Sequence, residues 1–475
     1  MRVALVNPNR LRPPIAPIAL EFLARALAEA GHEPDVIDLC FADEPNTELA
    51  GRLRGGGHGL VGLTIRNTDD CFMASGESFV PVHAGLVAAV REATEAPVVL
   101  GGAGFSATPT GLMRATDAEY GIVGDGEGAL AGLADALESG SAPRSADGLI
   151  CRGADGDSIA PAVFPSYIDG GPLRWEFADI ERYYRVGGQA GLETKRGCPM
   201  SCIYCADPLS KGTGVRLRAP AVVADEVAAL VARGVDHLHL CDSEVNVPTA
   251  HLEAVCKEVI SRRLGGSVRW YGYATVAGFD REVAALAARS GCAGVNFGAD
   301  SGDRAVLRRL GRGYGPEEVT AAVAACRSAG LAVMLDLLLG GPGESRESIA
   351  RTIELVKQAA PTCAGVSFGL RIYPGTELAA MVRRAGRLAA NPAVHGASEG
   401  NEDLALPVFY IEPTLGDDAE QFIADRIGGD ERFFFGGRVE AEADYNYNNN
   451  AVLEQAIADG ARGAYWHILA RARGL

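Results

Sequence analysis

Buried strands and amphipathic helices alternate along the first 140 residues. Apolar runs, typical of strands buried on both faces of a parallel sheet, occur at 2–9, 34–39, 59–66, 97–102 and 120–124. The segment 17–31 has the apolar periodicity of a helix and ends at Gly31, a residue type favoured just after a helix C-terminus. This alternation predicts an α/β domain with a doubly wound, Rossmann-like sheet over residues 1–140.

Ligands of doubly wound sheets bind beyond the carboxyl ends of the strands. In this chain those ends carry polar residues, and also glycines, which allow a ligand to approach the backbone closely. The candidate binding residues are Asn9, Arg66, Asn67, Gly101, Gly102, Gly104, Gly124, Gly126 and Glu127. Taken alone, these residues also fit an unspecialised sheet domain in which the glycines only make tight turns.

A second series of strands follows a connector. Residues 141–185 have weak periodicity and several Pro, Gly, Ser and Asp, which marks loops and the domain boundary. Apolar runs that end in polar clusters then occur at 191–196, 237–246, 267–275, 294–302, 331–345 and 365–378. They predict six βα units over residues 186–380. Residues 381–475 do not continue the pattern and are expected to form a small α-rich cap.

Three cysteines lie close together directly after the first strand of that series. Cys198, Cys202 and Cys205 have the spacing C-x-x-x-C-x-x-C. Three thiolates can hold three irons of a 4Fe–4S cube and leave the fourth iron open. The alternative is a zinc site, but zinc normally takes four protein ligands, and no second pair of cysteines follows at the expected spacing. The motif therefore favours an iron–sulfur cluster.

The charge balance restricts the partners. The 475 residues include 44 Lys and Arg against 61 Asp and Glu, a formal net charge of −17. A surface that follows phosphates needs positive charge, so we expect no nucleic-acid partner. No apolar stretch is long enough to span a membrane. The first residues lack the features of a signal peptide, so we expect a cytoplasmic protein with no membrane partner.

The motifs resemble two known families. The cysteine spacing and the βα units after it resemble the radical SAM superfamily, which implies that residues 186–380 form a partial (βα)6 barrel of the TIM type. The GGAG at 101–104 and GIVGDGEGAL at 121–130 resemble the cobalamin-binding domain that precedes many radical SAM domains. The whole chain resembles the cobalamin-dependent (class B) radical SAM methylases. This resemblance implies a 4Fe–4S cluster, S-adenosylmethionine and cobalamin as cofactors, a small-molecule substrate, and a reducing partner such as flavodoxin or ferredoxin.

The resemblance also assigns roles around S-adenosylmethionine. Tyr204 is expected over the adenine, and Asp242 and Glu244 near the methionine amino group. The remaining expected contacts, at the ends of the fourth, fifth and sixth strands, are Asp300, Ser301, Gly340, Pro342, Arg371 and Tyr373.

The lower face of cobalt is expected to lack a histidine. The D-x-H-x-x-G motif, whose His would ligate cobalt, is absent. By strand alignment Arg66 and Asn67 face the metal, and a guanidinium has no lone pair to donate. The alternative is that Arg66 forms an ion pair with Asp69 or Asp70 on a surface loop.

The C-terminal segment is rich in aromatic residues and asparagine. Tyr447, in the YNYN stretch with Tyr445, is a candidate catalytic residue that contacts substrate, because Tyr combines little conformational entropy with a polar tip. The alternative is a helical cap with these aromatics in its core.

The resemblance implies methylation of a carbon in a small natural-product precursor, by way of methylcobalamin and a 5′-deoxyadenosyl radical. One alternative keeps the cofactors but transfers the methyl group to an sp² carbon by a polar route, as in the tryptophan 2-C-methyltransferase, or catalyses a rearrangement or cyclisation. The other is a binding module without enzyme activity.

Overall fold

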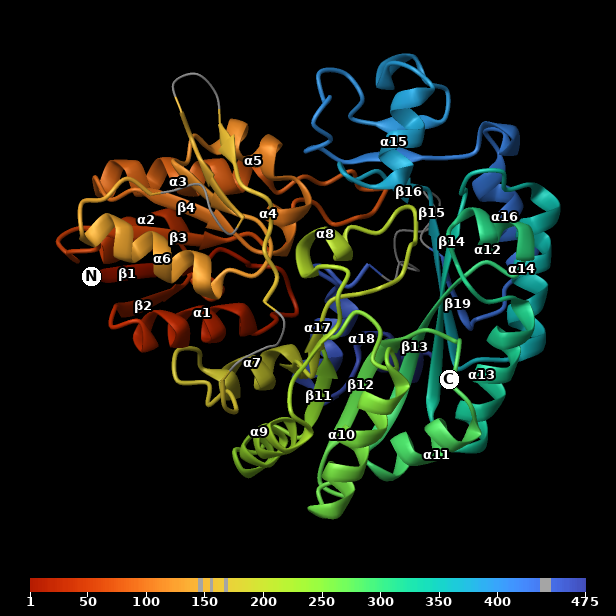
Figure 1. Cartoon of the computed structure of the whole chain (residues 1–475). Coiled ribbons are helices and arrows are strands. Elements are labelled where there is room, and N and C mark those ends of the chain that lie inside the picture. Colours follow the sequence, from red (N-terminus) through yellow and green to blue (C-terminus); the bar gives the residue numbers. More distant parts are fainter. Residues whose placement is uncertain (144–147, 154–156, 166–169, 436–445) are drawn as a thin grey trace.

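The computed structural model describes residues 1–143, 148–153, 157–165, 170–435 and 446–475. Two mainly parallel sheets, each covered by helices, lie side by side, the N-terminal sheet in red and orange and the second in green and cyan (Figure 1). The α/β class that the alternation predicts is confirmed.

The first sheet has the strand order β2-β1-β3-β4-β5-β6-β7. Its parallel strands are β1 (Arg2–Asn7), β2 (Glu33–Asp38), β3 (Leu60–Thr64), β4 (Val98–Gly101) and β5 (Tyr120–Ile122). Two short strands, β6 (Leu149–Cys151) and β7 (Ser158–Ile159), add antiparallel to the edge. These two come from the segment expected as a connector, so part of that segment extends the N-terminal sheet.

Helices cover both faces of this sheet, because alternate strand residues point to opposite sides. Val3 and Leu5 pack with α1 (Ile18–Glu29) and α6 (Glu127–Glu138), while Ala4 and Val6 lie in the other apolar cluster. The helices of that second face are α2 (Pro45–Leu53), α3 (Val80–Ala93) and α5 (Pro109–Thr116).

The second sheet has the order β19-β15-β14-β13-β12-β11-β8, with all neighbours parallel. The six predicted strands are β8 (Ala190–Leu192), β11 (His237–Leu240), β12 (Arg269–Ala274), β13 (Cys292–Asp300), β14 (Ala332–Leu339) and β15 (Cys363–Phe368). A seventh, β19 (Phe433–Phe435), joins from the C-terminal segment. The outer helices are α9 (Pro220–Ala232), α10 (Thr249–Ser261), α11 (Arg281–Arg289), α13 (Pro316–Ser328), α14 (Arg346–Ala359) and α16 (Ala419–Ile427).

The last two helices close the amino end of this open barrel. The apolar sides of α17 (Ala451–Ala458) and α18 (Tyr465–Ala472) form one cluster with the strand residues Tyr271, Met334 and Cys363. The C-terminal segment also contributes β17 (Val394–Gly396) and β18 (Val408–Tyr410), which form a small antiparallel sheet with β16 (Leu370–Arg371). The expected α-rich cap therefore contains strands as well, and the carboxyl end of the barrel is left for a site.

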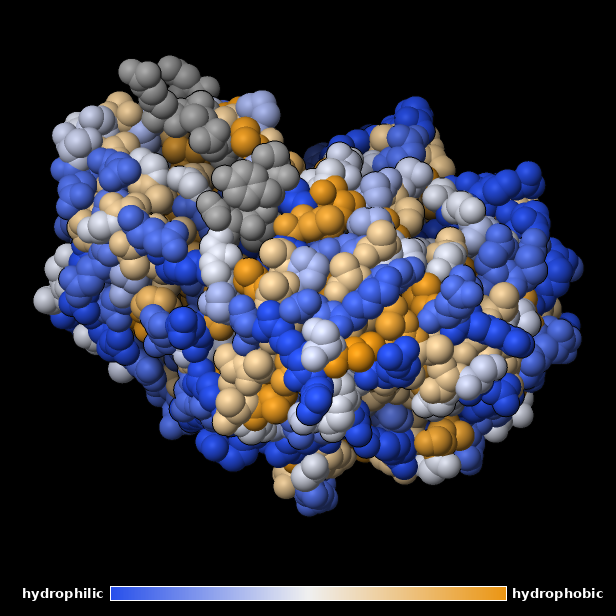
Figure 2. All heavy atoms as spheres, turned by 60° about the horizontal axis from the view of Figure 1, so that its bottom comes forward, coloured by the Kyte–Doolittle hydropathy of each residue, from blue (hydrophilic) through white to orange (hydrophobic). Residues whose placement is uncertain are grey.

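Shorter elements lie in the loops within and between the domains. They are α4 (Ala103–Ala107), α7 (Ile180–Gly187), β9 (Lys195–Arg196), α8 (Asp207–Lys211), β10 (Arg216–Leu217), α12 (Arg304–Arg309) and α15 (Glu377–Arg384). Among the described residues no helix is long and apolar enough to cross a membrane. The face in Figure 2 is mostly hydrophilic, with scattered apolar patches.

Candidate functional site

The three clustered cysteines line one cavity. Cys198, Cys202 and Cys205 follow β9 and border a space of about 390 Å³ at the carboxyl end of the barrel. Gly197 makes the turn into this loop at φ +92°, and a Cβ there would lie 2.1 Å from the carbonyl oxygen of Gly214. Only glycine fits that position.

The environment of the thiols suits a metal cluster. Burial raises the pKa of Cys198, of Cys202 to about 11, and of Cys205 to about 12. Thiolates at these positions therefore need the positive charge that metal ligation supplies. No other cysteine of the described residues lines this cavity. The donor set fits a cube that is held by three thiolates, with one iron left for another ligand.

The opposite wall carries a buried charge network. Asp300 ends β13 at φ +55°, and its Oδ2 accepts hydrogen bonds from the Tyr204 hydroxyl at 2.6 Å and from Arg312 Nε at 2.6 Å. All three residues line the cavity. Arg312 was not predicted, because Arg308, Arg309 and Arg312 follow one another closely and the sequence does not indicate which of them turns inward.

Glu244 presents an unpartnered acceptor to the same cavity. Its Oε1 lies 3.7 Å from an Arg312 nitrogen, and its Oε2 is buried without a hydrogen-bond partner in the described structure. Burial raises the pKa of Glu244 to about 7. An amino group of a ligand would satisfy this oxygen.

Four other predicted contacts do not line the cavity. The Asp242 carboxylate accepts hydrogen bonds from the backbone of Thr194 and Lys195 at 2.9 and 3.2 Å, so it fastens the strand that leads into the cysteine loop. The other three lie in the local packing of strand ends: Ser301 beside Thr352, Gly340 with its N–H on Glu344, and Pro342 in the following turn.

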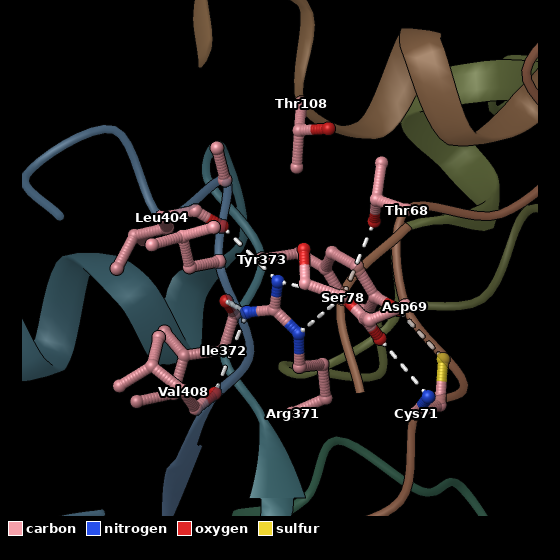
Figure 3. A network of polar contacts seen from close by, with 12 residues as sticks. Thr68, Asp69, Cys71, Ser78, Thr108, Arg371, Ile372, Tyr373, Leu404 and Val408 are labelled. Carbon is pink, nitrogen blue, oxygen red and sulfur yellow. Dashed lines mark hydrogen bonds and ion pairs between the residues drawn. The ribbon is translucent and has the colours of Figure 1, made fainter. Parts of the chain in front are cut away.

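Arg371 and Tyr373 lie at the domain interface instead of in the cavity (Figure 3). Arg371 Nε donates to Asp69 Oδ2 at 3.0 Å, and its other nitrogens donate to backbone carbonyls. The Tyr373 hydroxyl lies 2.9 Å from Cys71 Sγ. Both side chains already have protein partners, so the structure assigns them to holding the domains together.

A second cavity, of about 180 Å³, opens beside the N-terminal sheet. It lies between the carboxyl ends of the strands, α1 and α6, and has an apolar interior that includes Leu5, Leu63 and Val99. Five of the predicted residues line it together: Gly101, Gly102, Gly124, Gly126 and Glu127. An apolar pocket with a glycine rim suits the flat nucleotide end of a large cofactor.

Asn9 and Gly104 do not line this cavity. A Cβ on Gly104 would lie 2.9 Å from the carbonyl oxygen of Arg66. Gly104 is therefore explained by the close packing of α4 against the loop that follows β3. The Asn9 side chain accepts a hydrogen bond from the backbone of Leu11 at 3.3 Å and stays in its own turn.

Residues of the barrel domain close the second cavity. Arg196 pairs with Glu127 at 2.7 Å and with Glu193 at 2.8 Å. Lys211 of α8 lines this cavity, while its ion-pair partner Asp207, 3.0 Å away, lines the cavity of the cysteines. Helix α8 is thus the wall between the two spaces.

Arg66 is exposed and does not pair with Asp69 or Asp70. Asp69 binds Arg371, and Asp70 accepts a hydrogen bond from Ser75 Oγ at 2.6 Å, so the surface ion-pair alternative is not observed. Burial and, second, the nearby Arg66 guanidinium lower the pKa of His239 to about 4. The guanidinium therefore lies near His239 of β11, in the barrel domain. Asn67 follows in the same loop, with its Oδ1 buried and unpartnered.

Tyr447 lies outside the cysteine cavity. Its ring is 5.8 Å from that of Tyr465, and its hydroxyl donates to Met334 Sδ at 3.8 Å. It packs against the apolar cluster below the barrel, which agrees with the core alternative and not with substrate contact. Tyr445 lies outside the described residues.

The residues at the floor of the cysteine cavity were not predicted. Tyr273 and Asp336 line it from β12 and β14, and Asn296 of β13 lies between them. The strand pattern contained a signal, because these polar residues occupy inward positions of otherwise apolar strands.

Two family models match the chain. The radical SAM superfamily matches residues 192–356 and the B12 binding domain matches residues 9–134. The chain is 34% identical to the tryptophan 2-C-methyltransferase of Streptomyces laurentii, over 79% of this chain and 74% of that protein. The chain belongs to the cobalamin-dependent radical SAM methylase family.

Solved structures of a family member agree along the whole chain. The radical SAM methyltransferase TsrM of Kitasatospora setae, with tryptophan and the analogue aza-SAM bound, superposes with a TM-score of 0.90 at 30% identity. Its form with cobalamin and a [4Fe-4S] cluster gives 0.87 at 28% identity. Each comparison covers 100% of this chain and 99% of the other.

Several predictions are thereby confirmed. The chain is a cobalamin-dependent radical SAM methyltransferase. The predicted cofactor set of cobalamin, a 4Fe–4S cluster and S-adenosylmethionine is that of its family. The alternative of a binding module without enzyme activity is not supported.

Proposed function

We propose that this methyltransferase acts on an indole, at an sp² ring carbon, and that tryptophan is the first substrate to test. The observation that carries the proposal is the likeness of the whole chain to a relative with tryptophan bound, at 30% identity and a TM-score of 0.90. This favours the polar alternative of the sequence analysis over methylation of an unactivated carbon.

The proposed roles of the site residues follow from their positions. The three cysteine thiolates would hold the cluster, Glu244 Oε2 would accept the amino group of S-adenosylmethionine, and the paired Asp300 and Tyr204 would lie along its nucleoside. When bound, cobalamin supplies a methyl group that can pass to carbon.

On the other side, the glycine-rimmed cavity would hold the nucleotide end of cobalamin, with Arg66 toward the metal. Arg66 cannot ligate a metal, because its guanidinium has no free lone pair. It would keep a positive charge at the lower face and leave that face without a nitrogen ligand. The substrate would then lie between Arg66 and the cysteine loop, within the mouth of the barrel.

Product analysis tests this function. The reconstituted protein is incubated anaerobically with tryptophan, a reductant and S-adenosylmethionine that carries a deuterated methyl group. Labelled 2-methyltryptophan together with S-adenosylhomocysteine, without 5′-deoxyadenosine, is the expected result. Stoichiometric 5′-deoxyadenosine would establish the radical route instead, and unchanged tryptophan would contradict the proposed substrate. We also expect flavodoxin or ferredoxin to serve as the reducing partner.

A further inference from the structure

The floor of the cysteine cavity contains a polar pair on two neighbouring, mostly apolar strands. Asn296 of β13 and Asp336 of β14 lie on neighbouring strands, and Asn296 Nδ2 donates to Asp336 Oδ2 at 2.8 Å. Their other oxygens, Asn296 Oδ1 and Asp336 Oδ1, are buried and have no hydrogen-bond partner in the described part of the chain. Buried polar atoms are nearly always satisfied, so two unpartnered acceptors side by side need an explanation.

The chemistry of the missing partner follows from the two atoms. Both are acceptors, so the partner is a hydrogen-bond donor. The cavity has one cationic lining residue among those described, Arg312, and it is bound to Asp300. Burial raises the pKa of Asp336 to about 7, and a donor at Oδ1 would favour its ionised form. A carboxylate or phosphate of a ligand would be repelled from this position.

An aromatic ring lies next to the pair. Tyr273 is paired in register with Asn296, lines the cavity, and is 38% exposed. The ring of His239 meets it edge-on at 5.5 Å, which holds its orientation. A flat ligand can stack on such a surface, with a ring or side-chain nitrogen directed at the two oxygens.

We propose that Asn296 and Asp336 form the site that accepts an N–H group of the substrate, with the aromatic body of the substrate against Tyr273. The inference rests on the proposed function, because it takes the substrate to be an aromatic compound that carries nitrogen. It identifies the residues that set the orientation of the ring, and hence the carbon presented for methylation.

Binding of three probes tests the inference. L-Tryptophan, 1-methyl-L-tryptophan, which lacks the ring N–H, and indole-3-propionate, which lacks the amino group, are titrated calorimetrically into the reconstituted protein and its Asp336→Asn variant. Asp336→Asn keeps the shape and one acceptor oxygen for Asn296, but brings a donor to the cavity. We expect tryptophan to bind about tenfold more weakly to the variant, since a hydrogen bond to a charged group is lost.

The analogue that lacks the N–H group accepted by the pair should bind equally to the wild type and to Asp336→Asn. That result shows whether the pair accepts the ring N–H or the amino group of the substrate. Asn296→Ala should show the same dependence on the analogue, whereas Asp425→Asn on the outer helix α16 should bind all probes like the wild type. Equal affinity of tryptophan for wild type and Asp336→Asn overturns the inference, and so does an equal loss for all three probes. Wild-type protein that binds no probe overturns the inference and the indole substrate together. Methylated tryptophan formed by the wild type supports the proposed function whatever the variants bind.

Discussion

Arg371 Nε donates a hydrogen bond to Asp69 Oδ2 at 3.0 Å, and this contact crosses the boundary between the two domains (Figure 3). The pair is fully enclosed, with 5% of the Arg371 side chain and none of the Asp69 side chain exposed. Asp69 Oδ1 also accepts the backbone N–H of Cys71 at 3.0 Å. Because Asp69 lies three residues after Arg66, the pair fixes the loop that presents Arg66 to the barrel.

Removal of one partner should destabilise the protein strongly. Asp69→Ala leaves the Arg371 guanidinium buried without its counter-charge, and we expect a loss of about 3–5 kcal/mol in the free energy of unfolding. Urea denaturation measures it. The matched control is Glu377→Ala, which breaks the exposed pair with Arg384, whose side chains are 60% and 64% exposed. That pair should contribute about 0–1 kcal/mol, and equal effects of the two variants would contradict the role of the buried pair.

The cysteine loop should bind a single cube. Anaerobic reconstitution is expected to give about four irons per chain, and none in the variant with Cys198, Cys202 and Cys205 all replaced by Ala. Iron and sulfide analysis measures both. Cys151→Ala, in the distant strand β6, should keep the full iron content. A triple variant that retains a complete cluster would show that the ligands lie elsewhere.

Arg66 should determine the lower face of cobalamin. We expect Arg66→Ala to admit water to the metal, which changes the electron paramagnetic resonance spectrum of the cob(II)alamin form and slows methyl transfer. In the wild type that spectrum should lack the nitrogen splitting of an axial histidine. The control is Arg54→Ala, an exposed arginine that precedes β3 and so lies at the opposite edge of the sheet from Arg66. Identical spectra for wild type and Arg66→Ala would mean that this residue is not at the metal.

The carboxyl group of Asp336, at the floor of the cysteine cavity, should make the stability of the protein depend on pH. Burial raises the pKa of Asp336 from 3.8 to about 7, with Asp300 adding to the rise, so the folded protein binds more protons than the unfolded chain between these values. The free energy of unfolding therefore falls as the pH rises from about 4 to about 7, by roughly 1.4 kcal/mol for each unit of pKa difference. Above this range the whole destabilisation by the buried carboxylate is present.

An asparagine at position 336 does not ionise, so it does not destabilise the folded protein as the pH rises. Asp336→Asn without ligands should therefore be more stable than the wild type at pH 8, and the difference should shrink as the pH falls toward 4. Denaturation at several pH values measures this, with Asp425→Asn as the surface control. A difference that does not change with pH would contradict the cause given for the pKa shift.

The sequence by itself determined the parts of this protein that depend on local patterns. Apolar runs identify strands because a parallel strand is buried on both faces, and all eleven predicted strands are present in the two sheets. The cysteine loop could also be predicted from the sequence, because its three cysteines lie within eight residues and the short chain between them keeps them together. The same holds for the glycines around Gly102 and Gly124, which lie at strand ends that must meet at one edge.

Only the tertiary structure decided which polar groups face one another. Arg371 was expected beside a cofactor, but Asp69 reaches it from 302 residues away and neutralises it. Arg312 could not be chosen from sequence, because only its contact with Asp300 shows that it turns toward the cavity. The hydrogen bond between Asn296 and Asp336 likewise depends on the register of β13 against β14. Periodicity reports whether a position is buried, whereas the partner of a buried charge depends on packing between distant segments. That partner determines whether the charge holds the fold together or remains free for a ligand.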